Sequence, residues 1–248
     1  MTEYPGFDVL LARLANRRQL DVVDLSRSTG IPESALRSVF AGAVPEPPLL
    51  RGIAPALRLR AADLFVIAGM PVPDDLAPLD ARAGSMAASL VPDAMRLPRE
   101  DRRLLRRLVR SLPQEYRTQP VETPRAHEQF GWGPGGVLVR MVRNRNLSWG
   151  GTARTFLSLT GRYWAASTYG AVGHGRKELT SDLVADFSTV LDVPADTLSV
   201  LTGVDLPDVV LPPDPAAADV AELLWDVRRL TVEQVGQVGD TARSMLHG

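Results

Sequence analysis

Residues 28–42 read STGIPESALRSVFAG, and this short stretch decides the fold. One predicted helix ends at Gly30, where a left-handed backbone costs little because glycine has no side chain. A second predicted helix begins at Pro32, since proline suits the first position of a helix. So short a turn is typical of two helices packed at an angle. Whether the second helix only fills a core or also presents a face to a partner depends on the rest of the chain.

The chain contains a second copy of this region. Residues 10–20 align with 137–147, and residues 57–69 align with 191–203. Residues 87–100 align with 220–233, and the spacing between the copies changes little along the chain. Self-similarity that keeps its order and spacing indicates a tandem duplication.

The duplication divides the chain into two predicted units. The first unit covers residues 7–113 and the second covers residues 136–247. Residues 114–135 between them are rich in Pro, Gly and polar residues, which is typical of a linker. Apolar residues recur at helical spacing, and no stretch alternates with a period of two. We therefore predict an all-α fold with five short helices in each unit, followed by an amphipathic helix near 98–112 and its copy at 231–246.

Composition limits the classes of protein. The 248 residues are 45% hydrophobic and 23% charged, as in a folded globular protein. The absence of cysteine excludes disulfides and thiolate metal sites, and it suits a reducing compartment. Neither a long apolar run nor a signal-peptide pattern is present, so we expect a cytoplasmic protein with no membrane span.

Charge is distributed unevenly although the net charge is −1. Residues 131–177 hold basic residues and no Asp or Glu, whereas residues 178–248 are strongly acidic. The basic segment is the strongest electrostatic indication of a nucleic-acid interface. The arginine-rich stretch at 98–111 fits either a DNA contact or the solvated face of an amphipathic helix, and the second interpretation is favoured.

Residues 9–69 resemble a lambda-repressor-like helix-turn-helix domain of the xenobiotic-response-element class. The segments that carry the resemblance are LLARLANRRQL, DVVDLSRSTGIPESALRSVFAG and LLRGIAPALRLRAADLFVIAG. In that family the second helix of the pair lies in the major groove, and its first residues meet base edges. The resemblance therefore implies base contacts in the first unit from Glu33, Ser34, Arg37 and Ser38. Arg37 is the strongest candidate, because a guanidinium can bind guanine through two hydrogen bonds.

The second unit departs from the family pattern. About four extra residues lie between Leu147 and Gly161, and no proline follows the turn. The corresponding base-contact candidates are Arg162, Tyr163, Ala166, Ser167 and Thr168. Over both units, the candidate contacts to DNA phosphates are Arg18, Arg51, Arg145, Arg154, Arg176 and Lys177.

No enzyme motif is present in the sequence. The three histidines lie far apart, and no phosphate loop, nucleophile elbow or metal-ligand spacing occurs. We therefore expect no enzyme activity, no cofactor and no metal.

The sequence leads to one main functional hypothesis and one alternative. The main hypothesis is a sequence-specific regulator of transcription that binds double-stranded DNA through both units, with unequal half-sites. The alternative is a protein-interaction module, such as an antitoxin-like protein or a co-regulator, that keeps the helical fold but has lost one or both DNA-reading faces. The acidic segment at 178–248 favours either a basic protein partner or a face that does not contact DNA, and a small regulatory protein is the candidate protein partner. The helix at 231–246 either packs on its own unit or forms a homodimer.

Overall fold

The computed structural model describes residues 4–117, 128–206 and 214–247, and this part of the chain is helical throughout. The first half contains α1 (Phe7–Arg17), α2 (Val22–Thr29), α3 (Glu33–Phe40), α4 (Pro47–Ile53), α5 (Ala61–Ile67), α6 (Gly84–Arg96) and α7 (Arg99–Ser111), with a short 3-10 helix at Ala81–Ala83. The second half contains α8 (Pro134–Arg143), α9 (Trp149–Thr160), α10 (Ala166–Gly173), α11 (Ser181–Leu191), α12 (Ala195–Thr202), α13 (Pro215–Val227) and α14 (Val232–His247). The predicted all-α class is confirmed.

The two halves place their unusual turns at corresponding positions. In the described residues, every residue with a clearly positive φ has a counterpart in the other half. The pairs are Gln19 with Asn146, Gly30 with Gly161, Gly42 with Gly175, Arg58 with Asp192, and Gly69 with Gly203. Such agreement between backbone turns is what a tandem duplication would leave behind.

Two helices, not one, follow the first five in each half. The predicted helices near 98–112 and 231–246 are α7 and α14. The helices that precede them, α6 and α13, were not predicted. In α6 the helical pattern is interrupted by an internal proline, Pro92, and such residues usually signal a helix end.

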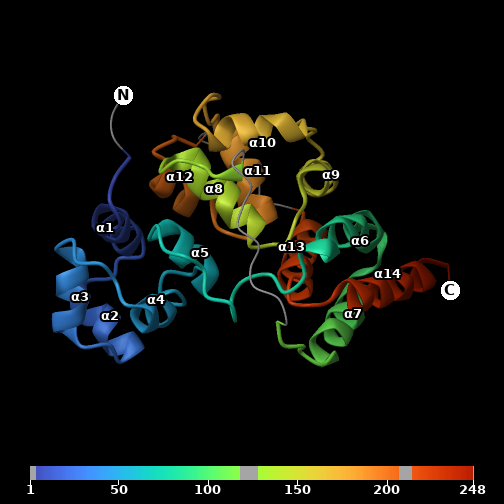
Figure 1. The fold of residues 1–248 in the computed structure, drawn as a ribbon, viewed down its shortest axis with the longest axis horizontal. Helices are drawn as coiled ribbons and strands as arrows, with labels where there is room; N and C mark the ends of the chain where they lie inside the picture. The colour runs from blue at the N-terminus through green and yellow to red at the C-terminus, as the bar shows by residue number, and fades with distance from the viewer. Residues whose placement is uncertain (1–3, 118–127, 207–213, 248) are drawn as a thin grey trace.

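Helices of the two halves pack against one another (Figure 1). The first helix of each half packs on the fifth helix of the other, α1 on α12 and α8 on α5. The trailing helices also cross over, because α6 packs on α14 and α7 packs on α13. One hydrophobic core runs through both halves, with Leu64 and Leu198 among its fully buried residues.

The predicted linker is shorter than its boundaries of 114–135. Residues 118–127 lie outside the described part. Phe130 is buried against the Trp149 ring, and α8 already begins at Pro134. Gly135 lets α8 approach α10 closely, because a Cβ atom there would lie 2.1 Å from the backbone oxygen of Val172. The GWGPGG segment therefore belongs largely to the second unit.

Candidate nucleic-acid interface and the joint between the units

The turn between α2 and α3 has the geometry that the sequence predicts. Gly30 is left-handed, with a φ of 72°. Thr29 fixes the turn, since its hydroxyl donates to the Leu25 carbonyl and accepts from the Ile31 backbone N–H. On the core side of α3, Leu36 is buried. The opposite face of α3 must therefore point to solvent.

All four base-contact candidates of the first unit lie on or beside this outer face. Ser34, Arg37 and Ser38 are exposed, and Glu33 is partly exposed. The Arg37 guanidinium donates to the Glu33 carboxylate at 2.6 Å, one helical turn away. An exposed ion pair of this kind contributes at most about 1 kcal/mol. Arg37 can therefore leave Glu33 for a stronger acceptor.

The second unit repeats the turn with two more residues in it. Gly161 is left-handed, and Thr160 makes the same two hydrogen bonds as Thr29. The turn before α3 consists of residues 30–32, whereas the turn before α10 consists of residues 161–165. Two of the five base-contact candidates of the second unit, Arg162 and Tyr163, consequently precede α10 and do not lie on it.

The outer face of α10 carries only small side chains. Arg162 forms an ion pair with Asp182 at 2.8 Å. Ser167 is exposed in the first turn of α10, and Thr168 is half-buried. When α10 is aligned with α3 from their first residues, Gly170 stands where Arg37 stands. A two-bond base contact from α10 itself is therefore not available.

The candidate phosphate contacts divide into two groups. Arg154, Arg176 and Lys177 are exposed and form no ion pair with a described residue, while Lys177 lies over the Trp164 ring. The other three contact residues of the same chain. Arg18 donates to the Thr197 hydroxyl, Arg51 forms two hydrogen bonds with Asp75, and Arg145 is only 1% exposed.

For Arg145 the expected phosphate contact is wrong, because the side chain is enclosed in the protein core. It forms an ion pair with the fully buried Asp63 at 2.5 Å and donates to the carbonyls of Met141 and Leu191. Asn144 donates to the same Asp63 oxygen. Arg145 therefore connects the second unit to α5 of the first. We call the contacts between the two units around Arg145, Asp63 and Asn144 the joint.

Arg18 makes the corresponding contact on the other side of the joint. It aligns with Arg145 in the duplication, and it reaches Thr197 of α12 in the same way that Arg145 reaches Asp63 of α5. Arg17 adds an exposed ion pair to Asp196. These contacts cross between the halves, so Arg18 also has a structural role.

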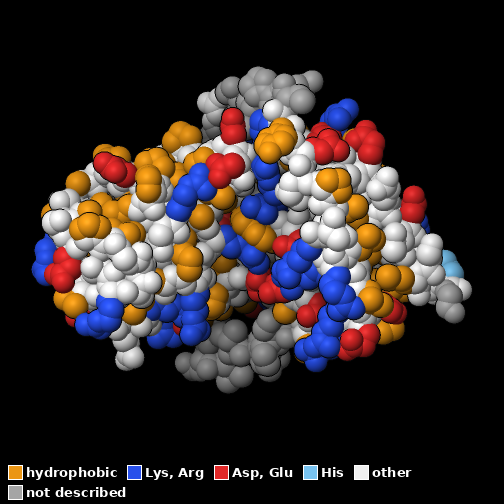
Figure 2. All heavy atoms as spheres, turned by 90° about the horizontal axis from the view of Figure 1, so that it is seen from below, with side chains coloured by type: hydrophobic (Ala, Val, Ile, Leu, Met, Phe, Trp, Pro, Cys, Tyr) orange, Lys and Arg blue, Asp and Glu red, His pale blue; other side chains and the backbone are white. Residues whose placement is uncertain are grey.

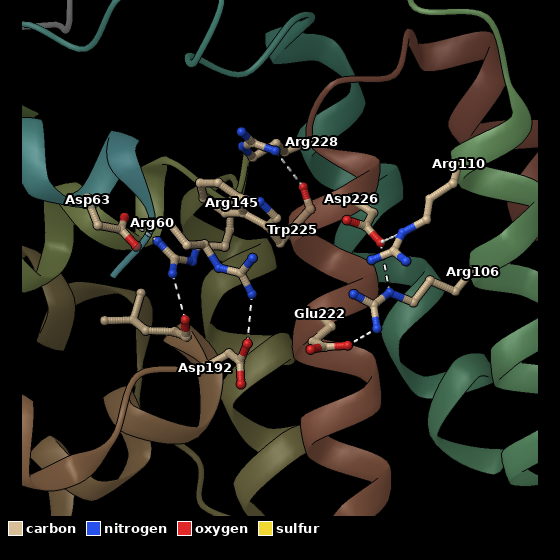
Figure 3. A network of polar contacts seen from close by, with 11 residues as sticks. Arg60, Asp63, Arg106, Arg110, Arg145, Asp192, Glu222, Trp225, Asp226 and Arg228 are labelled. Carbon is tan, nitrogen blue, oxygen red and sulfur yellow. Dashed lines mark hydrogen bonds and ion pairs between the residues drawn. The ribbon is translucent and has the colours of Figure 1, made fainter. Parts of the chain in front are cut away.

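A cluster around Trp225 extends this joint (Figure 3). The guanidinium groups of Arg60, Arg145 and Arg228 lie 4.5, 5.0 and 3.4 Å from the Trp225 ring centroid. Arg60 also pairs with Asp192. Burial raises the pKa of Asp192 despite these cations, and it lowers the pKa of Arg60.

Arg228 is the exception in this cluster, because it forms no ion pair with a described residue. Its guanidinium donates a hydrogen bond to the Trp225 carbonyl at 2.8 Å, and its Nε has no hydrogen-bond partner among the described residues. Burial lowers the pKa of Arg228 to about 9, and Arg145 adds electrostatic repulsion. This cluster was not predicted, although one feature points to it: Asp63 is the single carboxylate in the largely apolar segment LRLRAADLFVIAG.

Three arginines of α7 pair with acidic residues of α13. Arg102 pairs with Asp219, while Arg106 and Arg110 both reach Asp226. Arg106 also contacts Glu222. Figure 2 shows basic and acidic side chains interleaved on the face seen from below, rather than a patch of one sign. The acidic segment therefore has a basic partner within the chain.

The apolar side of α14 is occupied as well. Val235, Val238 and Ala242 are buried, and α14 packs on α6 and α7 of the first half. The apolar face of α14 is therefore used within the chain, and the predicted homodimer through residues 231–246 stays a prediction that would have to use the exposed face of this helix.

The chain is thus an all-helical protein with two helix–turn–helix pairs, and buried polar contacts connect the two units that contain them. In the described residues no helix is long and apolar enough to cross a membrane, and no cluster of possible metal ligands occurs. Comparison of the chain with family models, curated proteins and solved structures gave no match.

Proposed function

We propose that the protein binds double-stranded DNA and regulates transcription in the cytoplasm, with α3 as the reading helix. The observation that supports this most directly is the exposed face of α3. It places Ser34, Arg37 and Ser38 on the surface behind a tight glycine turn. Side chains at the start of such a helix are the ones that reach base edges in the major groove.

The second unit has a different part in this proposal. Arg154, Arg176 and Lys177 would hold phosphates, because they are exposed cations without carboxylate partners in the described chain. Phosphate contacts fix position and orientation but carry little sequence information. We therefore expect the operator to be one short asymmetric sequence. The DNA beside it should be needed only for contacts to its phosphates, whatever its base sequence. This differs from the two half-sites that the sequence analysis predicted.

The test begins with selection of bound duplexes from a random pool, followed by fluorescence anisotropy over a salt series. Arg37→Ala should weaken the free energy of DNA binding by about 1–3 kcal/mol and reduce the preference for the selected sequence. Arg176→Ala should weaken all duplexes alike and reduce the salt slope by about one. Arg107→Ala is the matched control, because Arg107 is exposed on α7 and forms no ion pair with a described residue.

Glu33→Gln gives a change in the opposite direction. It removes a negative charge from the reading face and releases Arg37 from its ion pair, so binding should tighten. If Arg37→Ala and Arg176→Ala both bind like the parent, these helices do not bind DNA. Absence of DNA binding at every salt concentration, together with a stable complex with another protein, would favour the interaction module. The charge argument for that alternative is weaker now that α13 pairs with α7.

A further inference from the structure

The second unit contains a cavity of about 70 Å³ beneath α10. Its inner walls are buried side chains from four helices: Val139 and Val142 of α8, Thr152 of α9, Tyr169 of α10 and Phe187 of α11. A water molecule needs roughly 10–15 Å³ of such space. The cavity therefore has room for a small organic molecule.

The outer end of the cavity is formed by partly exposed residues. The Arg143 guanidinium pairs with Glu128 at 3.1 Å and lies over the rings of Phe130 and Trp149. The Trp149 ring N–H donates to the Glu128 carboxylate. The two charges at this end already neutralise each other, so a charged guest would gain no counter-ion on entering.

One residue of the wall, Tyr169, carries a polar group without a partner. The Tyr169 hydroxyl is buried and makes no hydrogen bond with a described residue. The other wall hydroxyls are engaged, because Ser148 caps α9 and Thr152 donates to the Ser148 carbonyl. A buried hydroxyl without a partner costs free energy that a suitable guest would recover.

The first unit shows that the fold does not require this hydroxyl. Leu36 stands in α3 where Tyr169 stands in α10, and Leu36 is fully buried. An apolar side chain is thus sufficient to pack the second helix of the pair on the core. Tyr169 therefore gives the second unit a buried hydroxyl, on a residue that lines the cavity, which the first unit lacks.

We propose that this cavity is a binding site for a small, uncharged aromatic molecule of about the size of phenol, with one hydrogen-bonding group for Tyr169. The rings of Trp149, Tyr169 and Phe187 favour edge-to-face contacts with an aromatic guest. The guest touches α10 directly through Tyr169. This inference does not depend on the proposed DNA binding, since the site lies inside the second unit.

The test uses 4-fluorophenol as the probe and fluorine NMR on the full chain. 4-Fluorotoluene is the apolar control and 4-fluorobenzoate is the charged control. 4-Fluorophenol should bind saturably and roughly three- to tenfold more tightly than 4-fluorotoluene, since a net hydrogen bond contributes about 0.5–1.5 kcal/mol. 4-Fluorobenzoate should not bind.

Two variants make the test specific to the cavity. Tyr169→Phe keeps the ring, and it should bind 4-fluorophenol and 4-fluorotoluene about equally. Val142→Phe fills the space and should abolish binding of both. If Val142→Phe does not fold, the Tyr169→Phe comparison decides alone. Absence of saturable binding to the parent protein, or an unchanged preference in Tyr169→Phe, overturns the proposal, as does a crystal soaked with the probe that holds only water in the cavity.

Discussion

Replacing Asp63 by asparagine should destabilise the whole protein, because the change leaves Arg145 as an uncompensated buried cation. Asp63 is completely buried, and Arg145 is 1% exposed. The aspartate oxygen that accepts from Arg145 also accepts from Asn144, while the other oxygen has no partner. An asparagine in the same place could keep one acceptor oxygen, but it would carry no negative charge to balance Arg145.

Removing one partner of a buried ion pair costs about 3–5 kcal/mol. For a chain of this length each kcal/mol lowers the melting temperature by about 2–4 °C. Asp63→Asn should therefore lower the melting temperature by roughly 6–20 °C in a scan followed by circular dichroism. Asp196→Asn is the matched control on the other side of the joint. Its pair with Arg17 is exposed, so its loss should cost no more than about 1 kcal/mol.

A double variant separates the ion pair from the packing. Arg145→Met combined with Asp63→Leu removes both charges, and it should recover at least half of the lost stability, because apolar replacement of a buried pair is often close to neutral. The reasoning is refuted if Asp63→Asn melts as Asp196→Asn does. It is refuted as well if the double variant is less stable than Asp63→Asn alone.

Three further changes test the turns, the close helix contact and the unpaired arginine in thermal unfolding experiments. Gly30→Ala and Gly161→Ala should each lower the free energy of unfolding by about 1–2 kcal/mol, because both positions have a left-handed backbone. Gly150→Ala, in helical backbone with open space around it, should raise the free energy of unfolding by about 0.4–1 kcal/mol. Equal melting temperatures for all three would contradict the turn argument. Gly135→Ala should cost at least about 1–3 kcal/mol, since its Cβ would collide with the α10 backbone, and a neutral result would show that α8 can move away. Arg228→Met should raise the melting temperature, because it removes a buried cation without a carboxylate partner, and a lower value would show that its stacking on Trp225 outweighs the cost of burial.

Local features of the fold were predictable from the sequence. The end of α2 at Gly30 follows from the glycine itself, and the burial of Leu36 and Val39 follows from helical spacing. The duplication also predicted where the second unit would repeat a turn, at Gly161. These features depend on neighbouring residues, which a sequence comparison can see.

The uses of the charged residues were not predictable in the same way. The segment 131–177 looked like one basic footprint, yet Arg140 is half-buried near Trp132, and Arg145 is buried and paired with Asp63 of the other half. Burial lowers the pKa of Arg140, as expected for a cation drawn away from water. Whether an arginine faces solvent depends on packing between distant segments. A charge count along the chain contains no information about that packing.

The joint also changes what two helix–turn–helix pairs in one chain can do. Two units on a flexible linker could each bind a half-site independently, and binding would then tolerate different spacings between the half-sites. Here α1 packs on α12 and α5 packs on α8, while the trailing helices cross between the halves. These contacts bury a charged pair, so opening the joint would expose Asp63 and Arg145 together with the apolar residues around them. The orientation of α10 relative to α3 is therefore a fixed property of the fold. A fixed orientation is consistent with the proposal that α3 contacts bases while the exposed cations near α10 contact DNA phosphates at a fixed distance from those bases.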